Sequence, residues 1–358
     1  MTAETMTSRE RMLRMLNHQE ADRVPVCGSP WPATLDRWRR EGMPAGADYR
    51  EFFGLDIGHH LTPDCTPRYP WRLVEETEDW ITAVNSWGVT LRNWKHSAST
   101  PEYLDFTITT PDAWREAKAR MAPADDRVDW AWLERTYPRI RERGEWFEAG
   151  LWFGFDVTHS WAVGTERVLM AMLEEPEWMA DMFATELDLS LAMADRIWER
   201  GYRFDAVSWP DDMGYKGHQF FSVATYREFL KPLHRRVAGW ARAKGIKTRL
   251  HSCGDVRPFV AEFVDAGIDE LNPLEVKAGM DPLALKRAWG RQLALHGGIN
   301  ALLWDKPEAV AAEMRRVMPA LKEGGGYVFD VDHSIPSSVG VADFRRIVAL
   351  AKELGSYR

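Results

Sequence analysis

The chain has 358 residues, of which 45% are hydrophobic and 28% are charged. This length allows two or three small domains or one large α/β barrel, and the composition excludes a globally disordered chain. The formal net charge of −8 argues against a general nucleic-acid-binding protein, which needs a basic face, although local arginines can still bind a small anion.

The cysteine count and the N-terminal sequence bear on the cellular compartment. Three cysteines, Cys27, Cys65 and Cys253, are too few for a disulfide scaffold and indicate a reducing compartment. The first residues are charged and lack the apolar run of a secretory signal, and the sequence has no stretch of about 18 apolar residues that could form a transmembrane helix. We therefore expect a cytoplasmic protein without a membrane or nucleic-acid partner.

The first 130 residues contain few regular patterns. A capping-box spacing predicts a helix over residues 7–17, and residues 23–27 are predicted to form a short buried strand. Residues 28–130 are rich in tryptophan, proline and charge, and we interpret them as an irregular insertion that covers the carboxyl-terminal rim of the fold. Within it, residues 80–94 are typical of a β-hairpin that turns near 85–88. The 18 tryptophans are either ordinary core and surface aromatics or, together, the wall of a cavity for a flat or bulky ligand.

From residue 146 onward, strand patterns alternate with helix patterns. The predicted strands are 146–153, 204–209, 246–250, 268–271, 292–295 and 327–331, and the predicted helices are 166–174, 176–200, 223–244, 257–266, 282–289, 307–322 and 341–354. This alternation is typical of a parallel sheet. A doubly wound sheet is the alternative, but no glycine-rich nucleotide-binding motif follows a strand. We therefore predict an α/β fold, a (β/α)8 TIM barrel, formed by one domain over residues 1–358.

Polar residues follow five of the predicted strands directly. They are Asp211-Asp212-Met-Gly214, His251-Ser-Cys253-Gly-Asp255, Asn272-Pro-Leu-Glu275, His296-Gly-Gly-Ile-Asn300 and Asp332-His333-Ser-Ile-Pro336. In a parallel barrel the carboxyl ends of all strands lie on one rim, so we expect these clusters to converge.

The sharpest motif among them is His251-x-Cys253. In an extended segment, residues two apart point the same way, so an imidazole and a thiolate can reach one point. Zinc accepts such nitrogen and sulfur ligands and takes four in all, and Glu275 and His333 are the candidates to complete the set. The alternative is a hydrogen-bonded buried histidine beside a small buried thiol.

Other residues near the predicted rim are candidates for catalysis or substrate binding. Asp211 and Asp212 could orient a substrate or move a proton, with only one of them facing the rim, or they could form a turn. His333 could be a ligand, a proton donor or a structural residue. The candidate substrate contacts are Trp209, Gly297, Gly298 and Asn300, although the glycine pair could instead form a tight turn. The remaining polar or reactive residues, expected to be structural or surface residues, are Cys27, His59, His60 and Asp64.

Residues from about 204 to 345 resemble the uroporphyrinogen decarboxylase superfamily, whose members are (β/α)8 barrels. The resemblance is carried by Asp211-Asp-Met-Gly214, by Ser222 through Phe229-Leu-Lys-Pro232, by His251-Ser-Cys253-Gly254, by Gly297-Gly-Ile-Asn300, by Asp332-His333-Ser-Ile-Pro336 and by the opening Arg23-Val-Pro-Val. Each motif is short, but their combination and order are specific.

Two branches of this superfamily differ after the first strand. True uroporphyrinogen decarboxylases carry an arginine-rich segment there, which binds the substrate carboxylates, whereas here residues 27–37 have a single arginine, at the end. The His-x-Cys motif is similar to that of the corrinoid-linked methyltransferases, which use zinc to activate a thiol that accepts a methyl group. In those enzymes a cysteine near the last strand usually completes the ligand set, and this chain has His333 there.

The resemblance therefore implies a zinc-dependent methyltransferase that moves a methyl group between a corrinoid or a methylated small molecule and a thiol-type acceptor. The expected partners are a small-molecule substrate, a corrinoid protein and, in a homodimer, a second copy of the chain. The first alternative is a metal-free decarboxylase of uroporphyrinogen or another carboxylated aromatic, using Asp212 and His333. The second is a protein that binds a corrinoid or a flat aromatic ligand without chemistry of its own.

Overall fold

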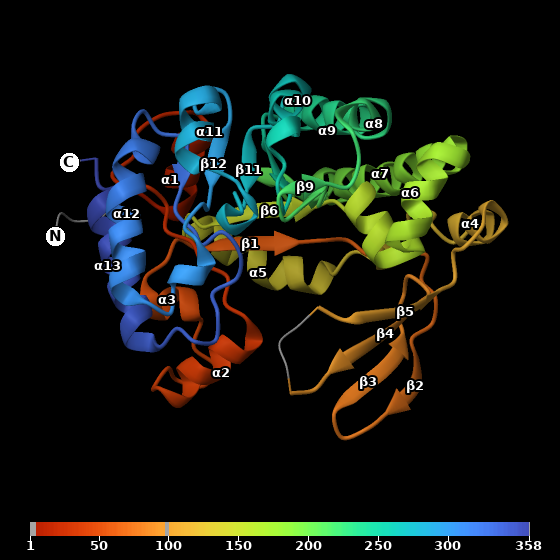
Figure 1. Ribbon diagram of the computed structural model, residues 1–358, viewed down its shortest axis with the longest axis horizontal. Helices are drawn as coiled ribbons and strands as arrows, with labels where there is room; N and C mark the ends of the chain where they lie inside the picture. The colour runs from red at the N-terminus through yellow and green to blue at the C-terminus, as the bar shows by residue number, and fades with distance from the viewer. Residues whose placement is uncertain (1–4, 97–99, 358) are drawn as a thin grey trace.

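Seven parallel strands form one curled sheet in the computed structural model of the chain, which describes residues 5–96 and 100–357 (Figure 1). In spatial order the strands are β1 (Gly58–Leu61), β6 (Trp146–Gly150), β7 (Ala206–Pro210), β10 (Lys247–His251), β11 (Glu270–Asn272), β12 (Ala294–His296) and β13 (Tyr327–Val328). All neighbouring pairs are parallel, which confirms the α/β class and the parallel sheet predicted from the alternating pattern.

The two edges of this sheet meet across the segment at residues 23–27. Val26 forms a parallel bridge with Phe329, just after β13, and the Cys27 N–H donates to the Phe329 carbonyl at 2.9 Å. On its other side, the Asp56 N–H, just before β1, donates to the Val26 carbonyl at 2.9 Å. The segment that was predicted as the first strand therefore occupies the eighth position of the ring, between β13 and β1.

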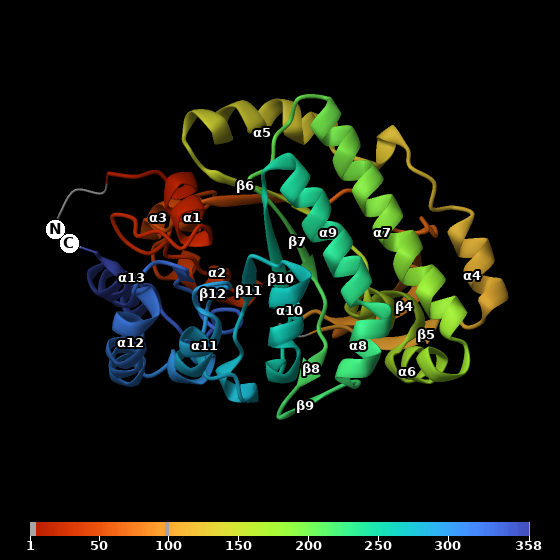
Figure 2. The same cartoon turned by 90° about the horizontal axis from the view of Figure 1, so that it is seen from above.

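Helices cover the outside of the sheet (Figure 2). They are α1 (Ser8–Leu16), α5 (Trp130–Glu142), α6 (Thr165–Glu174), α7 (Pro176–Glu199), α8 (Val223–Phe229), α9 (Lys231–Lys244), α10 (Val260–Ala266), α11 (Pro282–Trp289), α12 (Pro307–Lys322) and α13 (Val341–Gly355). The helix predicted over 223–244 is two helices, because Pro232 lacks the N–H that a continuous helix needs and instead starts a new one. Within the described residues, no helix is both long and apolar enough to cross a bilayer.

Residues 28–130, predicted to be irregular, contain several helices and strands in the structure. This segment contains α2 (Pro32–Arg40), α3 (Tyr49–Phe53), the barrel strand β1, a four-stranded antiparallel sheet and α4 (Pro111–Lys118), while residues 97–99 lie outside the described part. The strands of the small sheet are β2 (Arg72–Glu76), β3 (Trp80–Val84), β4 (Val89–Trp94) and β5 (Glu102–Phe106). The hairpin predicted over 80–94 is confirmed as β3 and β4.

The small sheet lies on the side of the molecule toward which β1 runs (Figure 1). It contacts the π-helical segment η2 (Val157–Val163), which follows β6, through an edge-to-face pair of Tyr103 and Trp161 with ring centroids 6.2 Å apart. Whether this sheet covers the rim, as we expected from the sequence, stays a prediction.

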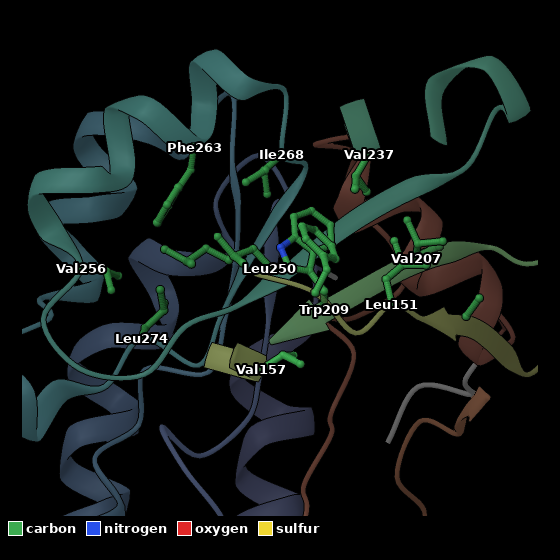
Figure 3. Packing of buried hydrophobic residues seen from close by; sticks show 14 of the residues in the cluster. Leu151, Val157, Val207, Trp209, Val237, Leu250, Val256, Phe263, Ile268 and Leu274 are labelled. Carbon is green, nitrogen blue, oxygen red and sulfur yellow. The ribbon is translucent and has the colours of Figure 1, made fainter. Parts of the chain in front are cut away.

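The core divides into an apolar layer outside the barrel strands and a polar interior. Between the strands and the helices pack apolar side chains such as Trp209, Leu250 and Phe263 (Figure 3). On the same strands, the alternate residues carry polar groups, among them Glu148, Arg249 and His296. The interior of this barrel is therefore polar, whereas branched apolar residues fill most barrels of this class.

Candidate metal centre and the adjoining cavity

Three potential metal ligands meet where β7 and β10 end. His251 is the last residue of β10, Cys253 follows two residues later, and Asp212 follows β7, the neighbouring strand. The His251 Nε2 atom is 3.4 Å from Cys253 Sγ and 3.9 Å from Asp212 Oδ1. All three ligand atoms lie within 4.8 Å of one another. The convergence expected from the parallel strands is thus present for these three residues.

A neighbouring strand orients the His251 ring. Asn272, the last residue of β11, pairs in register with His251, and its Oδ1 atom lies 2.6 Å from His251 Nδ1. An amide oxygen can only accept, so the proton sits on Nδ1 and the Nε2 lone pair faces Cys253 and Asp212. This is the tautomer that a metal-binding histidine requires.

Close backbone packing positions the loop that carries Cys253. Gly254 has a φ of +80°, and a Cβ atom there would lie 2.1 Å from the carbonyl carbon of Gly214. The two loops that follow β7 and β10 therefore touch backbone to backbone, which is possible only because both residues are glycine. The Cys253 N–H donates to Asp212 Oδ1 at 2.7 Å and completes this junction.

Replacing Gly254 by alanine is expected to destabilise the protein by about 1–3 kcal/mol, because the new side chain would meet backbone in a left-handed conformation. Chemical denaturation measures this loss. The matched control is Gly239→Ala, in an exposed turn of α9, where an added Cβ would have no atom within 4 Å and should stabilise the protein by up to about 1 kcal/mol. Equal stability of Gly254→Ala and the unmodified protein would contradict the packing argument.

Acidic groups surround the thiol. Burial and then the carboxylates of Asp212 and Glu275 raise the pKa of Cys253 well above its usual value. Burial, aided by the carboxylate of Asp156 and opposed by the His251 ring, raises the pKa of Asp212 to about 6. Burial disfavours any isolated charge here, but the carboxylates of Asp156, Asp212 and Glu275 would stabilise a bound cation. The donor set of one nitrogen, one sulfur and one oxygen fits zinc.

The two residues expected to complete the ligand set have different positions. Glu275 accepts a hydrogen bond from the Gly254 N–H at 2.6 Å and lies 3.1 Å from Lys277 Nζ, so Asp212 and not Glu275 forms the third member of the cluster. His333 lies on the wall of the same cavity as His251, with its ring centroid 5.7 Å from that of Trp31. Burial and then the Lys277 ammonium lower the pKa of His333, which leaves its ring uncharged near neutral pH.

A cavity of about 360 Å³ adjoins the cluster. It is lined by Ser29, Arg249, His251, Asn272, Pro273, His296, Asp330, Val331, His333 and Ser334. A second cavity of about 230 Å³ shares Ser29, Arg249, His296 and Asp330 with it and extends to Cys27, His59 and His60, which the sequence had led us to interpret as structural or surface residues. Among the tryptophans of the described chain, Trp146 is the one that lines these two cavities, so the tryptophans do not form a common cavity wall.

Two of the predicted site residues face away from the rim. Trp209 has 1% of its surface exposed and packs against the ring of His234 in the apolar layer (Figure 3). Asp211 is fully buried, and its Oδ2 atom lies 2.9 Å from His234 Nε2. Neither side chain lines the cavity beside His251, and the roles of Trp209 as a substrate contact and of Asp211 as a catalytic residue stay predictions. The alternation of the strand, continued past its end, turns both side chains outward and leaves Asp212 at the rim.

Gly297, Gly298 and Asn300 have structural roles. Gly297 has a φ of +101° and passes so close to Pro273 that a Cβ atom would lie 2.2 Å from the Pro273 carbonyl oxygen. Gly298 continues this turn with a φ of +80°. The Asn300 side chain accepts from the Leu302 N–H at 3.0 Å and caps a short helical turn. The tight-turn alternative thus describes the glycine pair, and in the described chain none of the three residues lines either cavity.

Arg249 and Asp156 are site residues that the sequence did not single out. Asn272 belongs to one of the polar clusters predicted at the rim, but no role of its own was predicted for it. Arg249 lies inside a strand, two residues before His251, so the same period of two could have placed it on the interior side.

The fold and the site together define an α/β-barrel enzyme with a candidate metal centre at the carboxyl ends of its strands. Residues 158–354 match the sequence model of the uroporphyrinogen decarboxylase (URO-D) family. This match covers more than half of the chain, and the chain belongs to the uroporphyrinogen decarboxylase family.

Relatives with this name match the chain in sequence, and a solved structure shares its fold. The uroporphyrinogen decarboxylase of Pseudomonas putida is 23% identical over 360 residues, which cover 94% of each chain. That of Pseudomonas fluorescens strain SBW25 is 28% identical over 133 residues, and the match spans only 35% of that enzyme. The structure of a methyltransferase from Methanosarcina mazei superposes with a TM-score of 0.65 over 98% of this chain and 99% of the other, at 18% identity, which shows a shared fold.

Proposed function

We propose that this chain is a zinc-dependent methyltransferase of the uroporphyrinogen decarboxylase family, with the metal held by Asp212, His251 and Cys253. The observation that carries the proposal is that these three donor atoms lie within 4.8 Å of one another beside a cavity of ligand size. Three protein ligands leave a fourth position for a substrate, as in catalytic zinc sites, and His333 is the residue across the cavity that could reach it.

The chain's own residues prepare the site. Asn272 holds the His251 ring with Nε2 directed at the cluster, and the Cys253 N–H fixes the Asp212 carboxylate. When bound, zinc would lower the pKa of a thiol or water at the open position. The uncharged ring of His333 can accept the proton released there, because it faces the same cavity. A methylated small molecule or a partner-bound corrinoid is the proposed methyl donor, and a thiol is the proposed acceptor.

The curated names of the relatives favour a second candidate, decarboxylation of uroporphyrinogen. The segment after the first strand argues against decarboxylation of uroporphyrinogen, because residues 27–37 contain a single arginine. Arg37, the arginine at its end, binds Glu41 at 2.6 Å and the Ser338 carbonyl at 2.5 Å, and lies on α2 instead of in a cavity. A substrate with several carboxylates requires several cations at its binding face.

Metal analysis of protein prepared without a histidine tag tests the proposal. We expect about one zinc ion per chain, lost in the double variant His251→Ala/Cys253→Ser. The matched control is Cys27→Ser, which removes a cysteine outside the cluster and should retain the metal. Stoichiometric zinc in the double variant, or none in the unmodified protein, would overturn the assignment.

Two activity assays separate the candidate reactions. Zinc-dependent demethylation of methylcobalamin in the presence of a thiol would support the methyltransferase. Conversion of uroporphyrinogen to coproporphyrinogen by both the unmodified protein and the His251→Ala/Cys253→Ser variant would instead establish the metal-free decarboxylase. If cobalamin quenches the tryptophan fluorescence but neither product forms, the chain is a corrinoid-binding protein without chemistry of its own.

A further inference from the structure

Arg249 lies on the wall between the two cavities, below the candidate metal centre. It is two residues before His251 on β10, so both side chains point into the barrel. Its side chain is 24% exposed and lines both cavities. Its Nη2 group donates to Glu148 Oε2 at 2.5 Å, and the other N–H groups of the guanidinium have no hydrogen-bond acceptor among the described residues. Arg249 therefore has donors available on its cavity side.

Asp330, a carboxylate on the wall of the cavity beside His251, already has hydrogen-bond partners. The Asp330 carboxylate accepts from the Val331 N–H at 2.7 Å through Oδ1, and its Oδ2 lies 3.2 Å from His296 Nε2. The other ring nitrogen of His296 lies 2.5 Å from Glu270 Oε1. With a carboxylate at each nitrogen, His296 carries both protons and is a second buried cation.

Other groups on the same wall also present donors. The Asn272 oxygen is occupied by His251, so its amide N–H groups remain for a ligand. Ser29 and Ser334 line the cavity as well, and a hydroxyl group can donate to a ligand. The wall of the cavity next to the metal centre thus offers several donors, although the chain as a whole is acidic.

We propose that Arg249 binds the carboxylate of a small organic acid that enters the cavity beside His251 and Cys253, and that this acid is the small-molecule substrate. A planar guanidinium with free N–H groups matches a carboxylate geometrically. Residues two apart on a strand are separated by roughly 7 Å, so the carboxylate and the reacting atom belong to a short molecule. The identification of this acid as the substrate rests on the proposed function, but its binding does not.

Binding to metal-free protein tests the inference by calorimetric titration with butyrate and with butyramide at constant ionic strength. The two probes have the same size and differ in charge. We expect butyrate to bind about 10- to 100-fold more tightly than butyramide, as charge-assisted hydrogen bonds to arginine would give. Equal affinity for the two probes would overturn the inference.

Variants assign the preference to Arg249. Removal of Arg249 alone would leave the buried Glu148 carboxylate without its arginine partner, so the test variant is Arg249→Met/Glu148→Gln and its matched control is Glu148→Gln. The control should keep the preference for butyrate or increase it, because it removes a negative charge beside Arg249, and the double variant should lose it. The double variant should have the same melting temperature as the control. If it then still prefers butyrate to butyramide, the role of Arg249 is refuted. The titration uses metal-free protein, so a negative result would not affect the zinc proposal. Equally, finding no zinc in the metal analysis would not affect the titration.

Discussion

Replacing Asp56 by alanine is expected to lower the free energy of unfolding by about 3–5 kcal/mol, because it removes a buried carboxylate that two arginines share. Asp56 accepts from Arg11 Nη1 at 2.9 Å and from Arg23 Nη1 at 2.6 Å, and the side chains of all three residues are at most 6% exposed. The same carboxylate accepts from the Val26 N–H at 2.8 Å. Asp56 thus ties the closing segment of the barrel to β1, and its loss weakens the ring at this position.

Urea denaturation followed by tryptophan fluorescence measures this effect. Asp56→Asn should cost less than Asp56→Ala, because the amide oxygen can still accept from Val26. The matched control is Asp36→Ala, which breaks an ion pair with Arg39 in which both side chains are at least 50% exposed, and should cost less than about 1 kcal/mol. A similar small loss for Asp56→Ala would show that the closure does not depend on this buried network.

Replacing Asn272 by leucine is expected to weaken metal binding by about 10- to 100-fold. Leucine has nearly the same size but offers no acceptor to His251 Nδ1, so the ring loses the contact that sets its orientation and tautomer. Competition with a chromophoric chelator, using zinc or cobalt, measures the affinity directly.

The control for this variant is Asn272→Asp, which keeps an acceptor at the same position and should keep metal binding within a few fold. The thermal stability of the two metal-free variants should be similar, since Asn272 lies at the cavity surface and not in the apolar layer. Metal affinity in Asn272→Leu equal to that of the unmodified protein would show that His251 needs no support from β11.

Much of the barrel could be predicted from the sequence because its signals are local. Helices with proline near the start and glycine after the end, such as α11, have boundaries close to those expected. The strand β1 was missed because Gly58-His-His-Leu61 is short and lacks apolar alternation. Its conformation is stabilised by parallel pairing with Trp146 and its neighbours on β6, a contact that the local sequence does not reveal.

In the candidate site, too, only the features with a local sequence signal could be predicted. His251 and Cys253 could be paired from their spacing, because an extended segment has a fixed period of two. Predicting that Asp212 and not Asp211 lies at the rim would have required the side-chain direction after β7. Predicting the hydrogen bond that His251 donates to Asn272 would have required the register between β10 and β11. These are properties of neighbouring strands, and the sequence of one strand does not contain them.

The closure of the ring at Val26 has a consequence for how this protein folds as it is synthesised. The partner of Val26 is Phe329, about 300 residues later, so this contact has one of the largest sequence separations in the chain. While the ribosome is still making the last βα units, the growing barrel is an open sheet with two exposed edges. Unpaired edges of this kind are the surfaces through which nascent chains associate wrongly, and they persist here until the final strand emerges.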